Sequence, residues 1–142
     1  MTNIQDTQLS SVPITSPSFR VLVIPANPHE PMRDDTIKDF YDLNRLVGCD
    51  TGDLVSVPSG AYSSLQHELW IDDEGLLKDA LFNTRASEIS GRTLVGNAVL
   101  TASNRDGETV DVDEAFAVSL VRDYELRVST SLHKTLVPFW YR

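Results

Sequence analysis

The sequence predicts an α+β fold, with a small mixed, mainly antiparallel sheet that is covered on one face by two helices. Three observations predict it. Short alternating or apolar segments outnumber helical ones, turn signals join most neighbouring segments, and only one early passage reads strand–helix–strand. With 142 residues, the chain is long enough for one domain with its own core. We expect residues 1–17, which are rich in Ser, Thr, Gln and Pro, to be a disordered leader, and residues 18–142 to form a single domain.

The first expected strand is Arg20–Ile24, an apolar, β-branched run that stops at Pro25 and suits a buried central strand. Three prolines then predict an extended connection, because each biases the preceding residue away from helix. They are Pro25, Pro28 and Pro31.

A helix is predicted to follow, from Asp34 to Val47. Asp34 and Asp35 suit an N-cap and the positive end of the helix dipole, and Gly48 suits a left-handed C-cap. Between them runs one face at three- and four-residue spacing. It consists of Ile37, Phe40, Tyr41, Asn44 and Val47.

Two strands are predicted next, at Asp53–Pro58 and Gln66–Asp72, because side chains alternate along both. The sequence Asp72-Asp-Glu-Gly75 predicts a tight turn into a third strand at Leu76–Lys78, with Gly75 at positive φ.

Beyond this hairpin we expect a helical turn at Arg85–Ile89, ended by Gly91, and a strand at Thr93–Ala102 with a bulge at Gly96. Asn104–Gly107 is a strong turn signal.

The last predicted helix is Val110–Leu126, with acids in its first turn and Arg122 and Arg127 near its end. Its apolar stripe is Val112, Phe116, Ala117, Leu120, Val121 and Tyr124. The aromatic end of the tail at residues 128–142 predicts docking on the domain or on another subunit.

Charge and cysteine content limit the possible partners. Twelve basic and twenty-one acidic residues give a net charge of −9, which disfavours direct binding to nucleic acid and to anionic membranes. A single cysteine, Cys49, excludes an internal disulfide, and no apolar stretch approaches the roughly 20 residues that span a bilayer. With no signal peptide in Met1–Pro17, we expect a cytoplasmic protein. Mimicry of DNA by the surface carboxylates is an alternative to simple solubility.

No catalytic motif is evident, so we expect no enzyme, no cofactor and no metal. His29, His67 and His133 lie outside any nucleophile motif, and His67 suits a half-buried packing position. The acids at positions 72–74 lack the alternate spacing of a calcium loop. Cys49 has no basic neighbours in sequence, which predicts an inert thiol.

Two blocks of sequence carry a family resemblance. The first runs from Ile24-Pro-Ala-Asn-Pro28 to Leu46-Val-Gly48, and the second combines Asp73-Glu-Gly75, Asn83-Thr-Arg-Ala86 and Leu94-Val-Gly96. In this order they resemble a family of small uncharacterised proteins of actinobacteria, their phages and their plasmids. The resemblance implies a compact core at about residues 20–103 with an extension at 104–142, and a phage or mobile-element setting. It implies no reaction.

Polar residues at family-matched positions are the candidate binding site. Asn27 and Asn83 also suit Asx turns, and Arg45 and Arg85 also suit pairing with local acids such as Asp42 and Glu88, so structural roles are the main alternative. Departures from the family pattern at Cys49 and at residues 82–84 weaken any transfer of a site. The candidates are Asn27, Asn44, Arg45, Asn83, Arg85 and Arg92.

The predicted function is that of a non-enzymatic phage or mobile-element accessory protein, which binds a host or phage protein in the host cytoplasm. Aromatic residues supply many interface hot spots, so the expected partner surface is Tyr124 with Phe139, Trp140 and Tyr141, and the tail could also join two copies of the chain. The main alternative is a small-ligand module that holds a nucleotide or another anion with Arg45, Asn83 and Arg85. The acidic DNA mimic is a further alternative.

Overall fold

The structure is a computed structural model that describes residues 17–59 and 63–125. Within them, a six-stranded sheet has the order β2-β1-β5-β4-β3, with β6 beside the end of β5, and each of these pairings is antiparallel. The predicted α+β fold with a mainly antiparallel sheet is therefore confirmed. The strands are β1 (Phe19–Ile24), β2 (Arg33–Ile37), β3 (Gly52–Val57), β4 (Gln66–Asp72), β5 (Ala98–Ser103) and β6 (Thr109–Val110).

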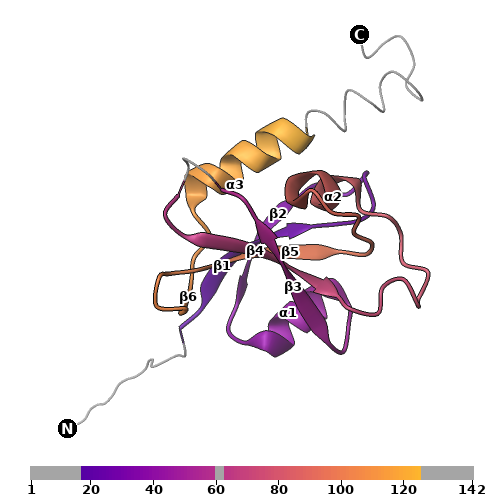
Figure 1. Cartoon of the computed structure of the whole chain (residues 1–142), viewed down its shortest axis with the longest axis horizontal. Helices are drawn as coiled ribbons and strands as arrows, with labels where there is room; N and C mark the ends of the chain where they lie inside the picture. The colour runs from indigo at the N-terminus through magenta and orange to yellow at the C-terminus, as the bar shows by residue number, and fades with distance from the viewer. Residues whose placement is uncertain (1–16, 60–62, 126–142) are drawn as a thin grey trace, which may run out of the picture.

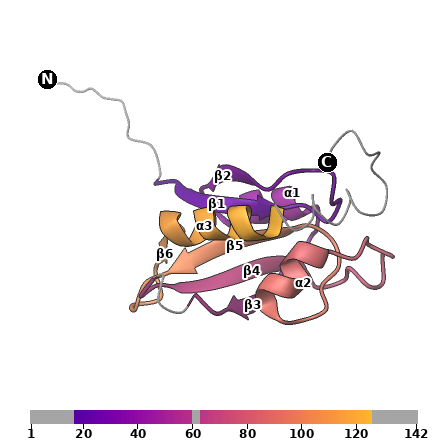
Figure 2. The ribbon, with the colours of Figure 1, turned by 90° about the horizontal axis from the view of Figure 1, so that it is seen from above.

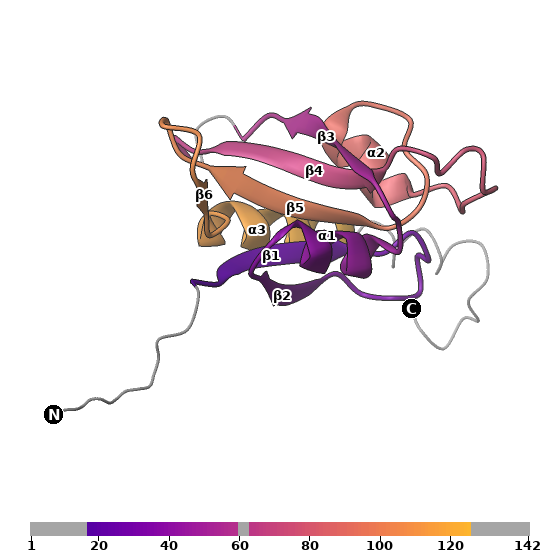
Figure 3. The same ribbon diagram turned by 90° about the horizontal axis from the view of Figure 1, so that it is seen from below.

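The helices lie on both faces of the sheet. α2 (Thr84–Ser90) and α3 (Glu114–Leu120) cover one face, which we call face A (Figure 2). α1 (Phe40–Val47) lies on the opposite face, face B, and crosses only part of it (Figure 3). The sequence predicted two helices on one face. A third helix is needed because the two central strands, β1 and β5, are apolar on both sides.

The residues of β1 show this division clearly. Leu22 and Ile24 belong to the core under α2 and α3, whereas Val21 and Val23 pack with α1 on face B. All four are at most 2% exposed.

The first helix begins later than the sequence predicted. Residues 33–37 pair with β1 as an edge strand, and the helix starts at Phe40 with Asp39 as its N-cap, so the assignment of Asp34 and Asp35 to its first turn was wrong. Asp39 accepts a hydrogen bond from the backbone N–H of Asp42. The predicted C-cap is confirmed, because Gly48 has a φ of 87°.

The segment after β4 also differs from the prediction. β3 and β4 form as expected, but residues 76–78 form a compact turn instead of a strand. Asp79 takes the positive φ that was predicted for Gly75. Gly75 is required for another reason, since a Cβ there would lie 2.8 Å from the side chain of Val95.

α2 is confirmed, and Gly91 is its left-handed C-cap. β5 begins at Ala98, later than the predicted Thr93, because residues 94–96 bond back to residues 81–83. Asn83 N–H donates to the Leu94 carbonyl, and Gly96 N–H donates to the Leu81 carbonyl. Gly96 has a φ of 80°, consistent with a break in the strand there.

α3 occupies the middle of the predicted last helix. Val110 lies in β6, Asp113 caps the helix, and a π-helical turn, η2 (Val121–Glu125), follows it (Figure 1). The leader at residues 1–16 and the tail at residues 126–142 lie outside the described residues. Among the helices of the described ranges, none has the length and apolar character needed to cross a membrane.

Candidate functional site

The family-matched motifs meet at a buried arginine. Arg85, in the first turn of α2, is 2% exposed, and its guanidinium donates hydrogen bonds to the carbonyls of Pro25, Asn27 and Glu30 at 2.7, 3.1 and 2.7 Å. The same group pairs with the carboxylate of Glu125. Arg85 therefore holds the proline-rich loop after β1 against α2.

Asn83 strengthens the same junction. It is fully buried, caps α2 by accepting from Ala86 N–H, and donates to the carbonyls of Ile24 and Gly96 at 2.9 Å each. Asn97 completes it by accepting from Ala26 N–H. These bonds satisfy polar groups that would be costly to bury alone.

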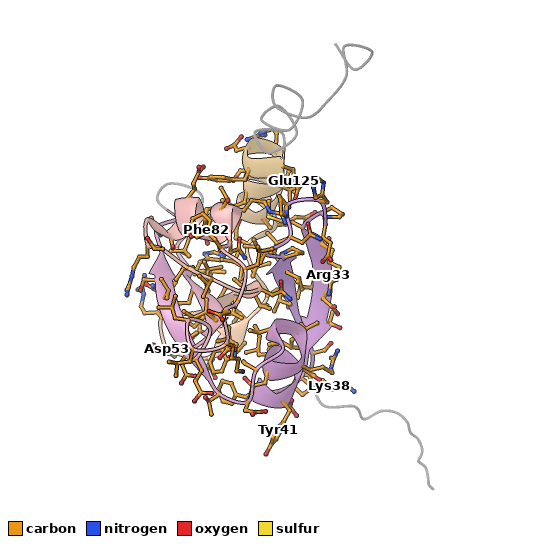
Figure 4. The ribbon with its side chains drawn as sticks, turned by 90° about the vertical axis from the view of Figure 1, so that its right-hand side faces the viewer. Arg33, Lys38, Tyr41, Asp53, Phe82 and Glu125 are labelled. Carbon is orange, nitrogen blue, oxygen red and sulfur yellow. The ribbon has the colours of Figure 1, made fainter. Side chains whose placement is uncertain are left out.

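Glu125 is a partner that sequence reasoning missed. The π-helical turn η2 places Glu125 at the end of α3 (Figure 4). Its carboxylate accepts from Met32 N–H as well as pairing with Arg85. The sequence predicted Glu88 as a local partner for Arg85, whereas the structure pairs Arg85 with a residue 40 positions away.

Asn44 has a structural role on face B. Its side-chain oxygen accepts from the indole N–H of Trp70 at 3.0 Å, and its amide donates to the Asp50 carbonyl. Trp70 also stacks on Phe40 with 5.4 Å between the ring centroids, and it lies across Gly52. Asn44 thus joins α1 to β4 and fixes the indole.

The other candidate polar residues lie at the surface. Asn27 accepts from His29 N–H, which is the predicted Asx turn, and Arg45 pairs with Asp42 at 3.2 Å, also as predicted. Arg92 is exposed and has no ion pair within the described residues. Arg45 lies on α1, on the face opposite Asn83 and Arg85, so the three residues of the proposed anion site are not brought together.

A groove lies on the part of face B that α1 leaves uncovered. Its volume is about 440 Å³, and it is lined by residues of all six strands and of α1. Leu54 and Phe40 are 44% and 66% exposed there. The half-buried Glu68 lies two residues before Trp70 on β4, opposite Ser56 of β3, and also lines the groove.

His67 lies on the opposite face, beneath α3. Its side chain is fully buried, Nε2 accepts from Asp113 N–H at 3.1 Å, and the ring lies 4.7 Å from that of Phe116. Nδ1 has no hydrogen bond of normal geometry within the part of the chain that the structure describes. Burial lowers the pKa of His67, although Asp113 and the Leu65 carbonyl oppose this, and the ring is held neutral against the helix N-terminus.

The thiol of Cys49 has a higher pKa than an ordinary thiol. Burial raises its pKa, the carboxylate of Asp72 raises it further, and Sγ lies 3.5 Å from the side-chain oxygen of Asn44. A thiol in this setting is a poor nucleophile near neutral pH.

The acids at positions 72–74 bring three potential ligand oxygens within 4.8 Å of one another. Two of them have partners from the chain, because Asp72 pairs with Lys78 at 3.0 Å and Asp73 accepts from the Thr51 hydroxyl. Burial acts to raise the pKa of Asp72, but its hydrogen bonds with Glu74 N–H and Lys78 hold it below the ordinary value. The cluster is thus part of an internal ion pair.

The segment after this cluster, residues 76–82, exposes four large apolar side chains, and we call it the apolar loop. They are Leu76 (79% exposed), Leu77 (84%), Leu81 (57%) and Phe82 (48%). The loop is fixed at its base, because Ala80 N–H donates to the Gly75 carbonyl at 3.0 Å and Phe82 forms a β-bridge with Val95. Phe82 lies at the edge of the molecule next to α2 (Figure 4).

Of the predicted partner surface, only Tyr124 is described. It lies in η2, half-buried against the core of face A. Phe139, Trp140 and Tyr141 lie outside the described residues.

The fold and the buried junction of sequence motifs define the class of protein as a small α+β domain. A family model described as a domain of unknown function, DUF3846, matches residues 20–125, and the chain belongs to this family. The match includes β6, α3 and η2, so these elements are part of the family domain and not an extension beyond it.

Other comparisons bear on the fold alone. A crystal structure of the small RNA methyltransferase HEN1 is similar to this chain with a TM-score of 0.60 and 18% sequence identity. The similarity covers 75% of this chain but only 16% of that one. No curated protein matches this sequence.

Proposed function

We propose that this protein is a non-enzymatic accessory protein of a phage or another mobile element, and that it binds a protein partner in the host cytoplasm. The apolar loop is the observation that carries the proposal. Four large apolar side chains within residues 76–82 are a costly exposure for a monomer, and patches of this kind mark interaction sites.

The order of the loop supports a binding role. Backbone hydrogen bonds within residues 74–80 and the contact of Gly75 with Val95 hold Leu76 and Leu77 outward. A loop that is already ordered loses little conformational entropy when it binds.

The environments of His67 and Cys49 are consistent with a non-enzymatic role. His67 is buried and bonded to the N-terminus of α3, and the thiol of Cys49 has a raised pKa. Arg85 and Asn83 are saturated by internal bonds, so they suit a structural role better than a ligand site.

Capture of partners from a host lysate tests the proposal. The double variant Leu76→Ser/Leu77→Ser should recover the wild-type partner at least about tenfold less well, since hot-spot losses reach about 2 kcal/mol or more. Val118→Ser, a change at a 54% exposed apolar position on α3, is the matched control and should recover it normally.

The tail requires its own comparison. Trp140→Ala and Tyr141→Ala test the predicted tail surface in the same assay, and unchanged recovery would exclude that surface. The proposal is contradicted if the loop variant captures every protein that the wild type captures.

A further inference from the structure

We propose that the groove on face B binds an arginine side chain carried by an apolar segment of the protein partner. The inference rests on the proposed protein-binding function and specifies the chemistry of the partner. Its central feature is a carboxylate in a groove that is also lined by apolar side chains. Glu68 is on β4, paired with Ser56 of β3 and with Thr101 of β5, and points to the open part of face B.

The carboxylate of Glu68 has no cation partner within residues 17–59 and 63–125. Lys38 lines the same groove but forms no ion pair with it, and the Thr101 hydroxyl donates to the Glu68 backbone carbonyl instead of the carboxylate. A half-buried charge beside apolar side chains is unfavourable until a cation neutralises it. Within the described residues, the carboxylate of Glu68 therefore lacks an ion-pair partner that would stabilise it.

The aromatic side of the groove suits a guanidinium. The indole of Trp70 is fixed in place by its bond to Asn44 and its stacking on Phe40. Because the indole already packs against Phe40 and Gly52, the ring open to a partner is that of Phe40. A guanidinium can stack on such a ring while it donates two hydrogen bonds to a carboxylate, which an ammonium cannot do equally well. Glu68 and Trp70 lie two residues apart on one strand, so they face the same side of the sheet.

The apolar rim favours a peptide over a free cation. Leu54 and Phe40 are 44% and 66% exposed at the edge of the groove, and they can bury the apolar neighbours of an arginine. A volume of about 440 Å³ is within the range of sites that hold small ligands or anchoring side chains. The net charge of −9 attracts a basic partner and disfavours a second copy of the same chain.

Titration of the full chain with a short peptide, followed by NMR of its backbone amides, tests the inference. The probe is acetyl-Leu-Arg-Phe-amide, and the matched control is the same peptide with citrulline, which keeps the shape of arginine without its charge. The arginine peptide should shift signals of β3 and β4 saturably. The citrulline peptide should bind about tenfold or more weakly, because it cannot donate charge-assisted hydrogen bonds to the carboxylate.

Glu68→Gln should remove this preference for arginine over citrulline. Glu114→Gln, which removes one negative charge from α3 on face A, is the control and should keep it. Equal binding of the two peptides, shifts confined to other surfaces, or a preference that survives in Glu68→Gln would each overturn the inference.

Other occupants give different results. Groove signals that move with protein concentration in the absence of peptide would assign the groove to a second copy. Signals that move in Arg127→Gln or Arg142→Gln would assign it to the chain's own C-terminal residues. Either result overturns the inference.

The lysate assay tests the proposed function, the titration tests the groove inference, and failure of one can be distinguished from failure of the other. If the titration succeeds and no partner depends on the apolar loop, the proposed function is wrong while the groove is an arginine site. If the loop-dependent partner is captured and the titration fails, the function stands and the groove inference is wrong.

Discussion

Arg85 connects three parts of the chain through one guanidinium. Arg85 is itself in the first turn of α2, and its side chain bonds to carbonyls of the loop after β1 and to Glu125 after α3. A side chain this deeply buried has no water to replace a lost partner, so its contribution to stability depends on every bond being made.

Arg85→Met should lower the free energy of unfolding by about 3–5 kcal/mol, because Glu125 and the loop carbonyls lose their donor inside the protein. Arg92→Met, at an exposed arginine, should change it by less than about 0.5 kcal/mol. Urea denaturation followed by circular dichroism measures both. Equal losses for the two variants would contradict the structural role of Arg85.

His67 makes the stability of the fold depend on pH. Its pKa is lowered from 6.5, so the folded state takes up its proton less readily than the unfolded state. The stabilisation is complete above pH 6.5 and decreases as the pH falls below it, until the lowered folded-state pKa is passed. Protonation would also turn Nε2 from an acceptor into a donor that faces Asp113 N–H.

His67→Gln should therefore lose less stability than wild type between pH 8 and pH 5, since its amide oxygen can accept from Asp113 N–H without titrating. The measurement is the unfolding free energy of both proteins across that range. Parallel pH curves for the two proteins would show that another group is responsible.

At the scale of single residues, the predictable contacts were the local ones. The Asx turn at Asn27 and the pair of Arg45 with Asp42 involve residues two and three positions apart, and both formed as expected. The pair of Arg85 with Glu125 and the bond of Asn44 with Trp70 were not predictable, because they depend on which elements meet in three dimensions.

Among the elements, β3 and β4 illustrate how a glycine can determine a side-chain position. A Cβ at Gly52 would lie 2.2 Å from Nε1 of Trp70, so only glycine leaves room for the indole on face B. The position of Trp70, and with it one wall of the groove, depends on this contact.

Gly52→Ala should lower the free energy of unfolding by about 1–3 kcal/mol, the usual cost of forcing an extra carbon into a packed site. Trp70→Leu should reduce the cost of Gly52→Ala if the ring is its cause. A double-mutant cycle by urea denaturation measures this coupling. Additive effects of the two substitutions would contradict the steric explanation.

Elements with their own capping signals were the predictable ones. Gly48 and Gly91 ended their helices as expected, and Gly52–Val57 and Gln66–Asp72 agree with the alternating pattern. The predicted start of α1 was wrong because Ile37 suits either an amphipathic helix or a strand. The pairing of residues 33–37 with β1 makes this segment a strand. Sequence periodicity alone does not reveal such tertiary choices.

The whole molecule carries a large excess of negative charge. Twenty-one acidic side chains against twelve basic ones give a net charge of −9, which repels itself more strongly in the compact state than in the unfolded chain. Exposed pairs such as Arg45 with Asp42 offset little of this repulsion.

Sodium chloride should therefore raise the midpoint of thermal unfolding at pH 7.5 as its concentration increases from about 0.01 to 0.15 M, where the screening length falls from about 30 to about 8 Å. Near the sequence pI of about 4.6 the same addition should have a much smaller effect, because the net charge is close to zero. An equal increase at both pH values would point to a general salt effect instead of charge repulsion.

The sheet order has a consequence for synthesis on the ribosome. β1 lies between β2 and β5, and its Leu22 pairs with Leu100 of β5. β1 is therefore synthesised first of the strands, and Leu100 follows Leu22 78 positions later in the chain. β1 and β2 can form a hairpin early, while the meander of β3, β4 and β5 assembles separately. We expect the nascent chain to reach its final topology only when β5 has left the exit tunnel and joins these two halves.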